Sequence, residues 1–114
     1  GEDCSAVEAG EGEVLVFSVD PITATEKGMG TFAVHVTAND IASSGAEPVG
    51  IMTSIILPPR KREKYLRELM GEIEAACREL EIEIMGGHTE ISNVVNQPVV
   101  TVTGVGKVKK EKRI

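Results

Sequence analysis

The chain alternates between short apolar runs, breaks rich in glycine or proline, and two longer segments with helical spacing. Apolar runs of strand length that end at Gly, Pro or polar clusters predict β-strands. The first two runs flank a Gly/Glu turn at residues 10–13, which predicts a hairpin. The expected strands span residues 4–7, 14–19, 49–57, 82–85 and 98–105.

The second expected strand leads directly into Asp20-Pro21. Proline has no backbone N–H to donate to a neighbouring strand, and it holds the preceding residue in an extended conformation. We therefore expect this strand to end there, with the Asp20 carboxylate at its mouth.

Two segments predict helices. Residues 28–44 place Phe32 and Val36 on one face, and Gly45 is a suitable stop. Residues 60–81 have the clearest helical pattern, because a single apolar stripe runs along an otherwise charged surface. The stripe consists of Leu66, Leu69, Met70, Ile73, Ala76, Cys77 and Leu80.

The elements follow one another in the order β-β-α-β-α-β-β, which indicates an α+β domain with two layers: a mixed sheet and helices on one of its faces. With 114 residues the chain is long enough for one domain, so we expect residues 1–114 to fold as a unit. The strand at 49–57 is apolar on both faces. Since the helices cover only one face, we expect the other to form a dimer interface.

Composition narrows the function. A net charge of -6 and a pI near 4.9 argue against nucleic acid as the main partner, although a divalent cation can still join acidic residues to nucleotide phosphates. The chain has no Trp, two Phe and one Tyr, so it has few aromatic side chains on which the bases of single-stranded nucleic acid could stack. It has neither a membrane-length apolar run nor a signal peptide, so we expect a cytoplasmic protein without a membrane partner.

Acidic residues recur where the predicted strands and helices end. Hard divalent cations take several oxygen ligands, and carboxylates from separate elements can converge on one ion. Each residue also has a simpler interpretation, as a turn former, a surface residue of a helix or an exposed residue near a terminus. The position of Asp40 favours the cation site over these simpler interpretations. Together with Asn39 it places polar groups inside an otherwise apolar helix, and buried polar groups need partners. The candidates are Glu2, Asp3, Asp20, Asp40 and Glu90.

Residues 85–90 (MGGHTE) predict a sharp turn followed by a polar loop. Two glycines let the backbone bend and approach a bound group closely. His88 has three interpretations: metal ligand, phosphate contact or loop cap. There is no Walker-type GxxxxGK[ST] loop and no spacing typical of a Ser/His/Asp or Cys/His site. The residues by themselves indicate a magnesium-dependent phosphate site.

Four motifs resemble those of the aminoimidazole ribonucleotide (AIR) synthetase superfamily, whose type member is PurM. Residues 1–7 (GEDCSAV) resemble its GDDAAV opening, and residues 17–23 (FSVDPIT) resemble its S-T-D element. Residues 33–48 (AVHVTANDIASSGAEP) are similar to its N-D-[IVL]-x-x-x-G-A-x-P helix. The pair 76–78 (ACR) and 85–90 is similar to its A-C-R and G-G-[EDH]-T elements. Within the superfamily, the motifs look most like those of the hydrogenase-maturation protein HypE and its relatives.

The resemblance implies the amino-terminal domain of an ATP-dependent enzyme that activates a carbonyl or amide oxygen by phosphorylation, with two such domains pairing through the exposed sheet face. It implies ATP and Mg²⁺ as cofactors. The implied metal ligands are Asp3, Asp20 and Asp40, with Glu2 and Glu90 as lesser candidates. The implied nucleotide-binding residues are Asp3, Asp20, Asn39, Asp40, Gly86, Gly87, His88 and Thr89.

The chain departs from the family pattern at two positions. Glu2 stands where the family usually has Asp, and His88 stands where many members have a carboxylate. The second domain of family members is also missing, so we expect the chain to be a fragment that does not catalyse alone. These departures leave open a second interpretation, a non-catalytic dimerisation module that retains only the fold.

Overall fold

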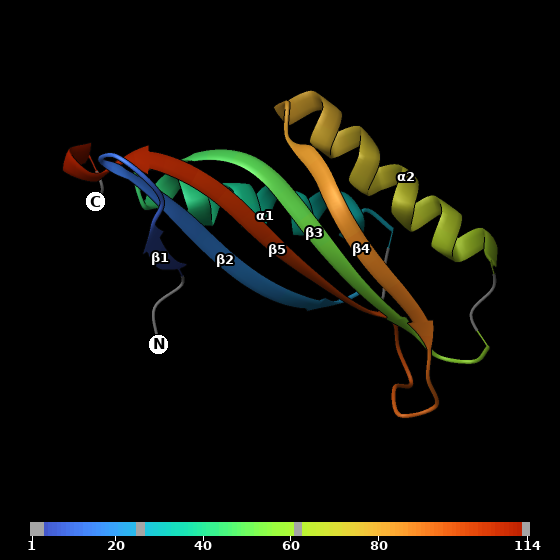
Figure 1. The fold of residues 1–114 in the computed structure, drawn as a ribbon. Helices are drawn as coiled ribbons and strands as arrows, with labels where there is room; N and C mark the ends of the chain where they lie inside the picture. The colour runs from blue at the N-terminus through green and yellow to red at the C-terminus, as the bar shows by residue number, and fades with distance from the viewer. Residues whose placement is uncertain (1–3, 25–26, 61–62, 113–114) are drawn as a thin grey trace.

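The computed structural model of the chain describes residues 4–24, 27–60 and 63–112. Within these ranges it has a five-stranded sheet in the order β1-β2-β5-β3-β4, two α-helices and a short 3₁₀ helix (Figure 1). β3 and β4 are parallel and the other neighbours antiparallel. The elements are β1 (Cys4–Glu8), β2 (Glu13–Thr23), α1 (Met29–Ser43), β3 (Glu47–Leu57), α2 (Glu63–Leu80), β4 (Glu83–Ile91), β5 (Val99–Lys109) and η1 (Lys110–Lys112).

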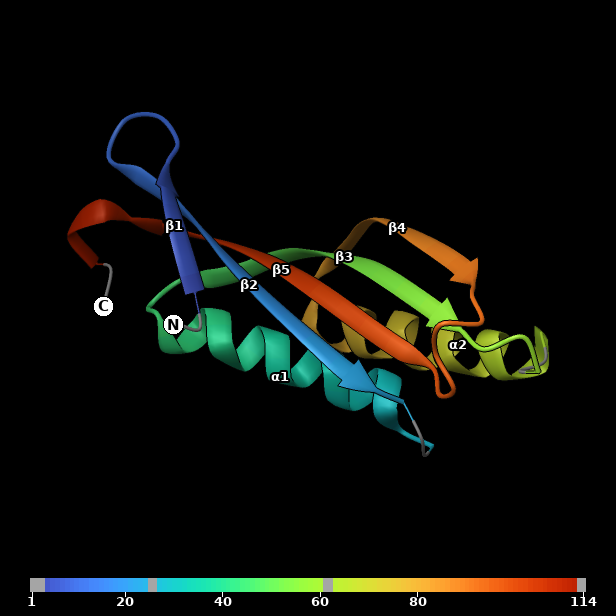
Figure 2. The same cartoon turned by 90° about the horizontal axis from the view of Figure 1, so that it is seen from below.

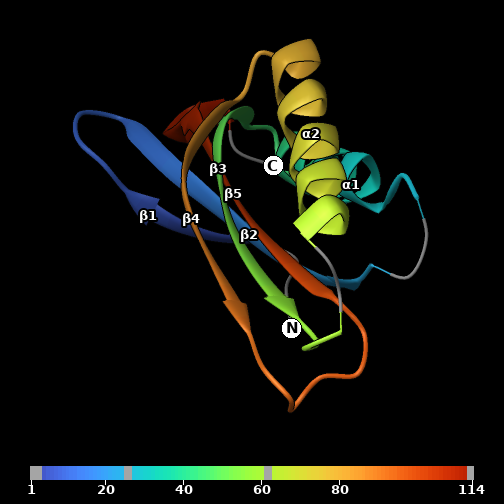
Figure 3. The same cartoon turned by 90° about the vertical axis from the view of Figure 1, so that its right-hand side faces the viewer.

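The predicted α+β fold with helices on one face of a mixed sheet is confirmed. Figures 2 and 3 show both helices on the same side of the sheet, with the opposite face open. The element order is the expected one. None of the helices in the described ranges combines the length and apolar character that crossing a bilayer requires.

β2 continues through Pro21, so the prediction that it ends at Asp20 is wrong. Pro21 pairs with Thr101 of β5, and the ladder continues to Thr23. β1 pairs only with residues 14–18 of β2, so at Pro21 the outer side of β2 has no neighbouring strand among the described residues. A proline is tolerated at such an edge position, because no partner there needs its missing N–H.

The predicted turn at Gly86-Gly87 is also wrong, because both glycines lie within β4. Neither has a positive φ. Gly87 pairs with Thr53 of β3, and a Cβ at Gly87 would lie 3.0 Å from the Thr53 backbone oxygen as well as against its hydroxyl. The glycine is therefore needed where two strands pack closely, and not for a bend.

The core lies between the sheet and the helices. The prediction for α2 is confirmed: Leu69, Ile73, Ala76 and Cys77 of its apolar stripe are buried. In α1 the buried face differs from the one that carries Phe32, which is 54% exposed. The turn of 100° per residue puts Phe32 almost opposite this buried face. The face consists of Gly30, Ala33, Val34, Thr37 and Ile41.

A side chain of α2 forms hydrogen bonds with the backbone at the start of α1. The residue at the N-cap position of α1 is Gly28, which has no side chain to cap the helix. Instead, Glu72 of α2 accepts hydrogen bonds from the backbone N–H groups of Gly28 (3.1 Å) and Gly30 (2.8 Å). The Tyr65 hydroxyl of the same helix donates to the carbonyl oxygen of Ala24, at 2.6 Å. These contacts fix the start of α1 and the end of β2 against α2.

Candidate functional site

Two of the predicted acidic residues converge on one hydroxyl group. The Ser18 Oγ lies 3.1 Å from Asp20 Oδ2 and 3.3 Å from Asp40 Oδ2. Ser18 and Asp20 are two residues apart on β2 and so point to the same face, towards α1, which carries Asp40. The two aspartates are 20 positions apart in sequence and meet only because α1 packs across β2.

The negative charges of Asp20 and Asp40 repel each other unless a positive charge lies nearby. A side-chain hydrogen bond with Asp20, then burial and the Asp20 charge, raise the pKa of Asp40, while the hydrogen bond from Ser18 opposes this shift. Ser18 has a single hydroxyl proton and cannot donate it to both carboxylates at once. A proton or a cation between the two carboxylates would relieve the repulsion between their charges.

A magnesium ion fits the chemistry of this donor set. Mg²⁺ is commonly held by one or two carboxylates together with substrate phosphates and water. In the described parts of the chain, no group of three or more His, Cys, Asp or Glu side chains is placed to hold a metal ion. Asp20 and Asp40 therefore supply only part of a coordination sphere.

The amino-terminal end of β1 lies beside the same pair. Cys4 Sγ lies 3.4 Å from the backbone oxygen of Asp40. The predicted ligands Glu2 and Asp3, which precede Cys4 in sequence, lie outside the described residues. Asn39 is on the exposed side of α1.

The structure places the other candidates elsewhere. His88 Nε2 and Glu90 Oε1 of β4 are 3.0 Å apart on the open face of the sheet, where their side chains are 67% and 52% exposed. β5 and β3 lie between β2 and β4, so the backbones of the strands that carry Asp20 and the His88–Glu90 pair are about 14 Å apart, at three strand spacings. Within one chain, the His88–Glu90 pair and the Asp20–Asp40 pair thus lie on opposite faces. Thr89, which lies between His88 and Glu90 on β4 and pairs with the core residue Ile55, points to the helical side.

Comparison with known proteins assigns the fold and its motifs to a family. Residues 1–108 match the model of the AIR synthase related protein, N-terminal domain. The chain belongs to this family. The predicted family resemblance is confirmed.

Relatives of this AIR synthase-related domain include hydrogenase-maturation proteins. A hydrogenase expression/formation protein of Methanocaldococcus jannaschii is 30% identical over 99% of the chain, which corresponds to 35% of that protein. The carbamoyl dehydratase HypE of Bradyrhizobium diazoefficiens is 32% identical over 80% of the chain and 28% of that protein. The chain therefore spans about a third of the length of the curated relatives it matches.

Solved structures share the fold of the AIR synthase-related domain. A hydrogenase maturation protein HypE in complex with ATP has a TM-score of 0.81 at 24% identity, covering 94% of the chain and 33% of that protein. ThiL of Aquifex aeolicus, whose structure contains AMPPCP and TMP, has a TM-score of 0.84 at 21% identity, with 95% and 36% covered. At these identities the likeness establishes the fold alone.

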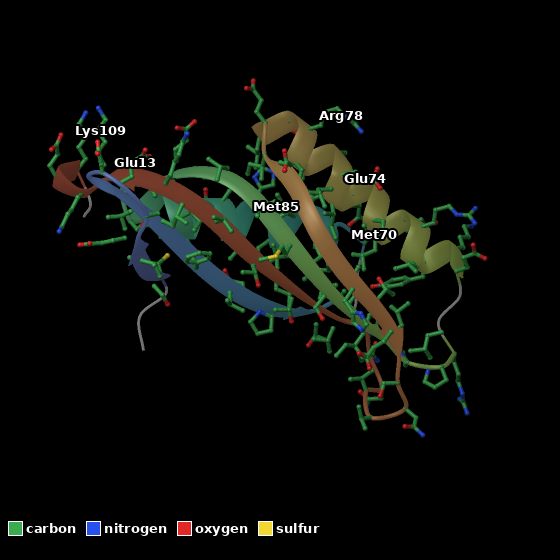
Figure 4. The ribbon with its side chains drawn as sticks, in the orientation of Figure 1. Glu13, Met70, Glu74, Arg78, Met85 and Lys109 are labelled. Atoms are coloured by element: carbon green, nitrogen blue, oxygen red, sulfur yellow. The ribbon has the colours of Figure 1, made fainter. Side chains whose placement is uncertain are left out.

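The sequence analysis did not predict the contacts of Ser18 or the packing of Met85. Ser18 was not a candidate, although its spacing of two from Asp20 on a strand places both on one face. Met85 lies on β4 (Figure 4), where the pairing with β3 shifts its register between Ile51 and Met52, and its side chain lies against Gly50 of β3. A Cβ at residue 50 would meet the sulfur of Met85, which is 49% exposed, so a larger residue at this position would require the Met85 side chain to move.

Proposed function

We propose that this AIR synthase-related domain binds ATP with Mg²⁺ as the amino-terminal part of a HypE-like enzyme that activates a carbonyl or amide oxygen by ATP-dependent phosphorylation. The convergence of Asp20 and Asp40 on Ser18 carries the proposal. Support also comes from the relatives, which include carbamoyl dehydratases, and from the HypE structure that contains ATP. Because the chain covers about a third of these relatives, catalysis would require the rest of the protein.

In this proposal Asp20 and Asp40 would hold the magnesium ion from β2 and α1. A bound magnesium ion would supply positive charge that offsets the negative charge of the nucleotide phosphates. Ser18 would keep the two carboxylates in register by donating to one of them. Glu2 and Asp3 would complete the acidic set from the segment before β1, and Asn39 would contact the nucleotide from α1.

The open face of the sheet would pair with a second copy. It exposes apolar side chains from four strands, which the helices do not cover. A homodimer through this face would bury them. It would also place Gly86, Gly87, His88, Thr89 and Glu90 of β4 at the border between two subunits, where they would meet a nucleotide. The exposed apolar residues are Val7 (56%), Val19 (58%), Met52 (39%) and Met85 (49%).

A dimerisation module without chemistry is the second candidate. It is favoured by the absence of a complete metal-ligand set among the residues the structure describes, and by His88 at a position where the family pattern has a carboxylate. In this case the open face would still pair, but ATP would not bind. Binding measurements therefore separate the two candidates.

Isothermal titration calorimetry of the intact protein with ATP and Mg²⁺ tests the first proposal. We expect wild-type binding that is lost in Asp20→Asn and Asp40→Asn and retained in Glu79→Gln, which changes an exposed carboxylate on α2. Wild-type protein that does not bind ATP, or aspartate variants that bind it as wild type does, would reject the proposal.

A further inference from the structure

Two glycines of β5, Gly104 and Gly106, face α1, which lies along this side of the sheet (Figure 2). A Cβ atom at Gly104 would overlap the methyl group of Thr37, and one at Gly106 would overlap a methyl group of Ile41. Both of these α1 residues are 1% exposed. Because glycine has no side chain, the backbone of β5 and the buried face of α1 approach each other more closely here than a larger residue would allow.

Gly104 lies directly beside the hydroxyl group on which Asp20 and Asp40 converge. It pairs with Ser18 of β2, and residues that are opposite each other in an antiparallel pair point to the same face. Thr37, which fills the space left by Gly104, precedes Asp40 by three positions and so belongs to the same turn of α1. The turn that carries Asp40 therefore rests on Gly104, next to Ser18.

The packing of this turn against the sheet tolerates little movement. The distance of 3.3 Å from Ser18 Oγ to Asp40 Oδ2 is already long for a hydrogen bond between two oxygens. The Thr37 hydroxyl donates to the carbonyl of Ala33, at 2.9 Å, and this buried bond keeps the Thr37 methyl group against Gly104. A methyl group added at residue 104 would therefore push this turn outwards and carry the Asp40 carboxylate away from β2.

We infer that Gly104 is a positioning residue of the cation site: by letting α1 approach β5, it sets the separation of the Asp20 and Asp40 carboxylates to suit Mg²⁺. This inference rests on the proposed binding of ATP with Mg²⁺ and adds the residue that determines which divalent cation the site prefers. Mg²⁺ requires oxygen ligands at about 2.0–2.1 Å in nearly ideal octahedral geometry, whereas Ca²⁺ accepts about 2.3–2.6 Å and a flexible arrangement. A wider pair of carboxylates therefore disfavours Mg²⁺ more strongly than Ca²⁺.

Equilibrium binding of Mg·ATP and of Ca·ATP to the intact protein, each at a saturating concentration of the cation, tests the inference. We expect Gly104→Ala to lower the preference for Mg·ATP over Ca·ATP about tenfold, at the lower end of the effect that residues around the ligands of a metal have on its affinity. The readout is the ratio of the two dissociation constants. A general loss of folded protein would weaken both complexes alike and leave this ratio unchanged.

Two further variants separate positioning from stability. Thr37→Ser removes the methyl group that a Cβ at residue 104 would overlap and keeps the hydroxyl that donates to Ala33. The other contacts of this Cβ, with Ile41, are 3.4 Å and 3.8 Å, so the double variant Gly104→Ala/Thr37→Ser should regain the wild-type preference. Ile73→Val removes a buried methyl group from α2 and should lower stability without changing the preference.

The failure of this inference is distinguishable from that of the proposed function. Wild-type protein that binds neither complex would overturn the proposed function and the role of Gly104 with it. A folded Gly104→Ala variant with the wild-type preference would overturn the role of Gly104 alone. Urea unfolding adds a measurement that does not depend on binding: Gly104→Ala should cost less stability in the Thr37→Ser background than in wild type, and an equal cost in both would overturn the inferred contact.

Discussion

Glu72 of α2 accepts a hydrogen bond of 2.8 Å from the backbone N–H of Gly30 in the first turn of α1. The same carboxylate accepts a second bond from Gly28. The first N–H groups of a helix have no partner within the helix, and a carboxylate also interacts favourably with the helix dipole there. The Glu72 side chain thus provides the cap that Gly28, at the N-cap position, cannot provide.

Replacing this cap should destabilise the domain. We expect Glu72→Ala to lower the free energy of unfolding by about 1–2 kcal/mol, because the N–H groups of Gly28 and Gly30 lose their acceptor. Glu72→Gln keeps one acceptor oxygen, so its free energy of unfolding should fall by less than that of Glu72→Ala. Urea denaturation followed by circular dichroism measures both. Glu74→Ala, an exposed position on the same helix, is the control, and an equal loss in this variant would show that Glu72 acts only through helix propensity.

Gly87 and Gly86 should respond differently to the same substitution. A Cβ at Gly87 meets the hydroxyl and backbone oxygen of Thr53, whereas one at Gly86 meets no atom within 4 Å. We therefore expect Gly87→Ala to cost about 1–3 kcal/mol and Gly86→Ala much less. Thermal or urea unfolding compares the two variants. Equal effects would mean that the separation of β3 and β4 does not depend on Gly87.

The stability of the metal-free domain should depend on pH through Asp40. Its pKa is raised in the folded state, so the folded protein holds the proton more tightly than the unfolded chain does. This contribution is fully present below the unfolded pKa, about 3.9, and is lost as the pH rises through the folded value. Asp40→Asn should remove this loss of stability at higher pH. In the presence of EDTA, the difference in the free energy of unfolding between Asp40→Asn and wild type should therefore shift in favour of the variant from pH 3 to pH 7.

Denaturation curves at several pH values measure this difference. Added Mg²⁺ should reduce the advantage of Asp40→Asn at neutral pH, because a bound cation stabilises the two carboxylates of wild type. Curves for wild type and variant that stay parallel across the pH range would contradict the raised pKa.

Two substitutions of similar exposure test the proposed dimer. Val19 on the open face is 58% exposed, and Phe32 on the helical side is 54% exposed. We expect wild type to sediment as a dimer at micromolar concentration, Val19→Lys to sediment as a monomer, and Phe32→Lys to remain dimeric, since a charge opposes burial only at the interface. A monomeric wild type, or dissociation by Phe32→Lys alone, would exclude the open face.

Local pattern was sufficient for the parts of the fold whose residues lie close in sequence. The amphipathic stripe of α2 and the β1–β2 hairpin follow from spacing, because each element presents its apolar residues to the same side. The motif order identified the family, and the acidic pattern identified Asp20 and Asp40 as candidates. Each of these features follows from residues that are close together in the sequence, or from the order of such short motifs along the chain.

Other features depend on neighbours that the sequence pattern does not reveal. Pro21 remains within β2 because that edge of the strand has no described partner at this point. Gly87 is extended because Thr53 lies against it, although two glycines in sequence are typical of a turn. The buried face of α1 is set by Gly104 and Gly106 of β5, where Cβ atoms would meet Thr37 and Ile41.

The sequence by itself determined the class of fold, the family and the acidic residues from which a cation site can be built. Only the tertiary structure decided that Asp20 and Asp40 share the hydroxyl of Ser18, while His88 and Glu90 lie on the opposite face. The physical reason is that periodicity specifies which way a side chain points from its own element. Which two elements then meet depends on how the helices and strands pack, and that packing involves residues far apart in the chain.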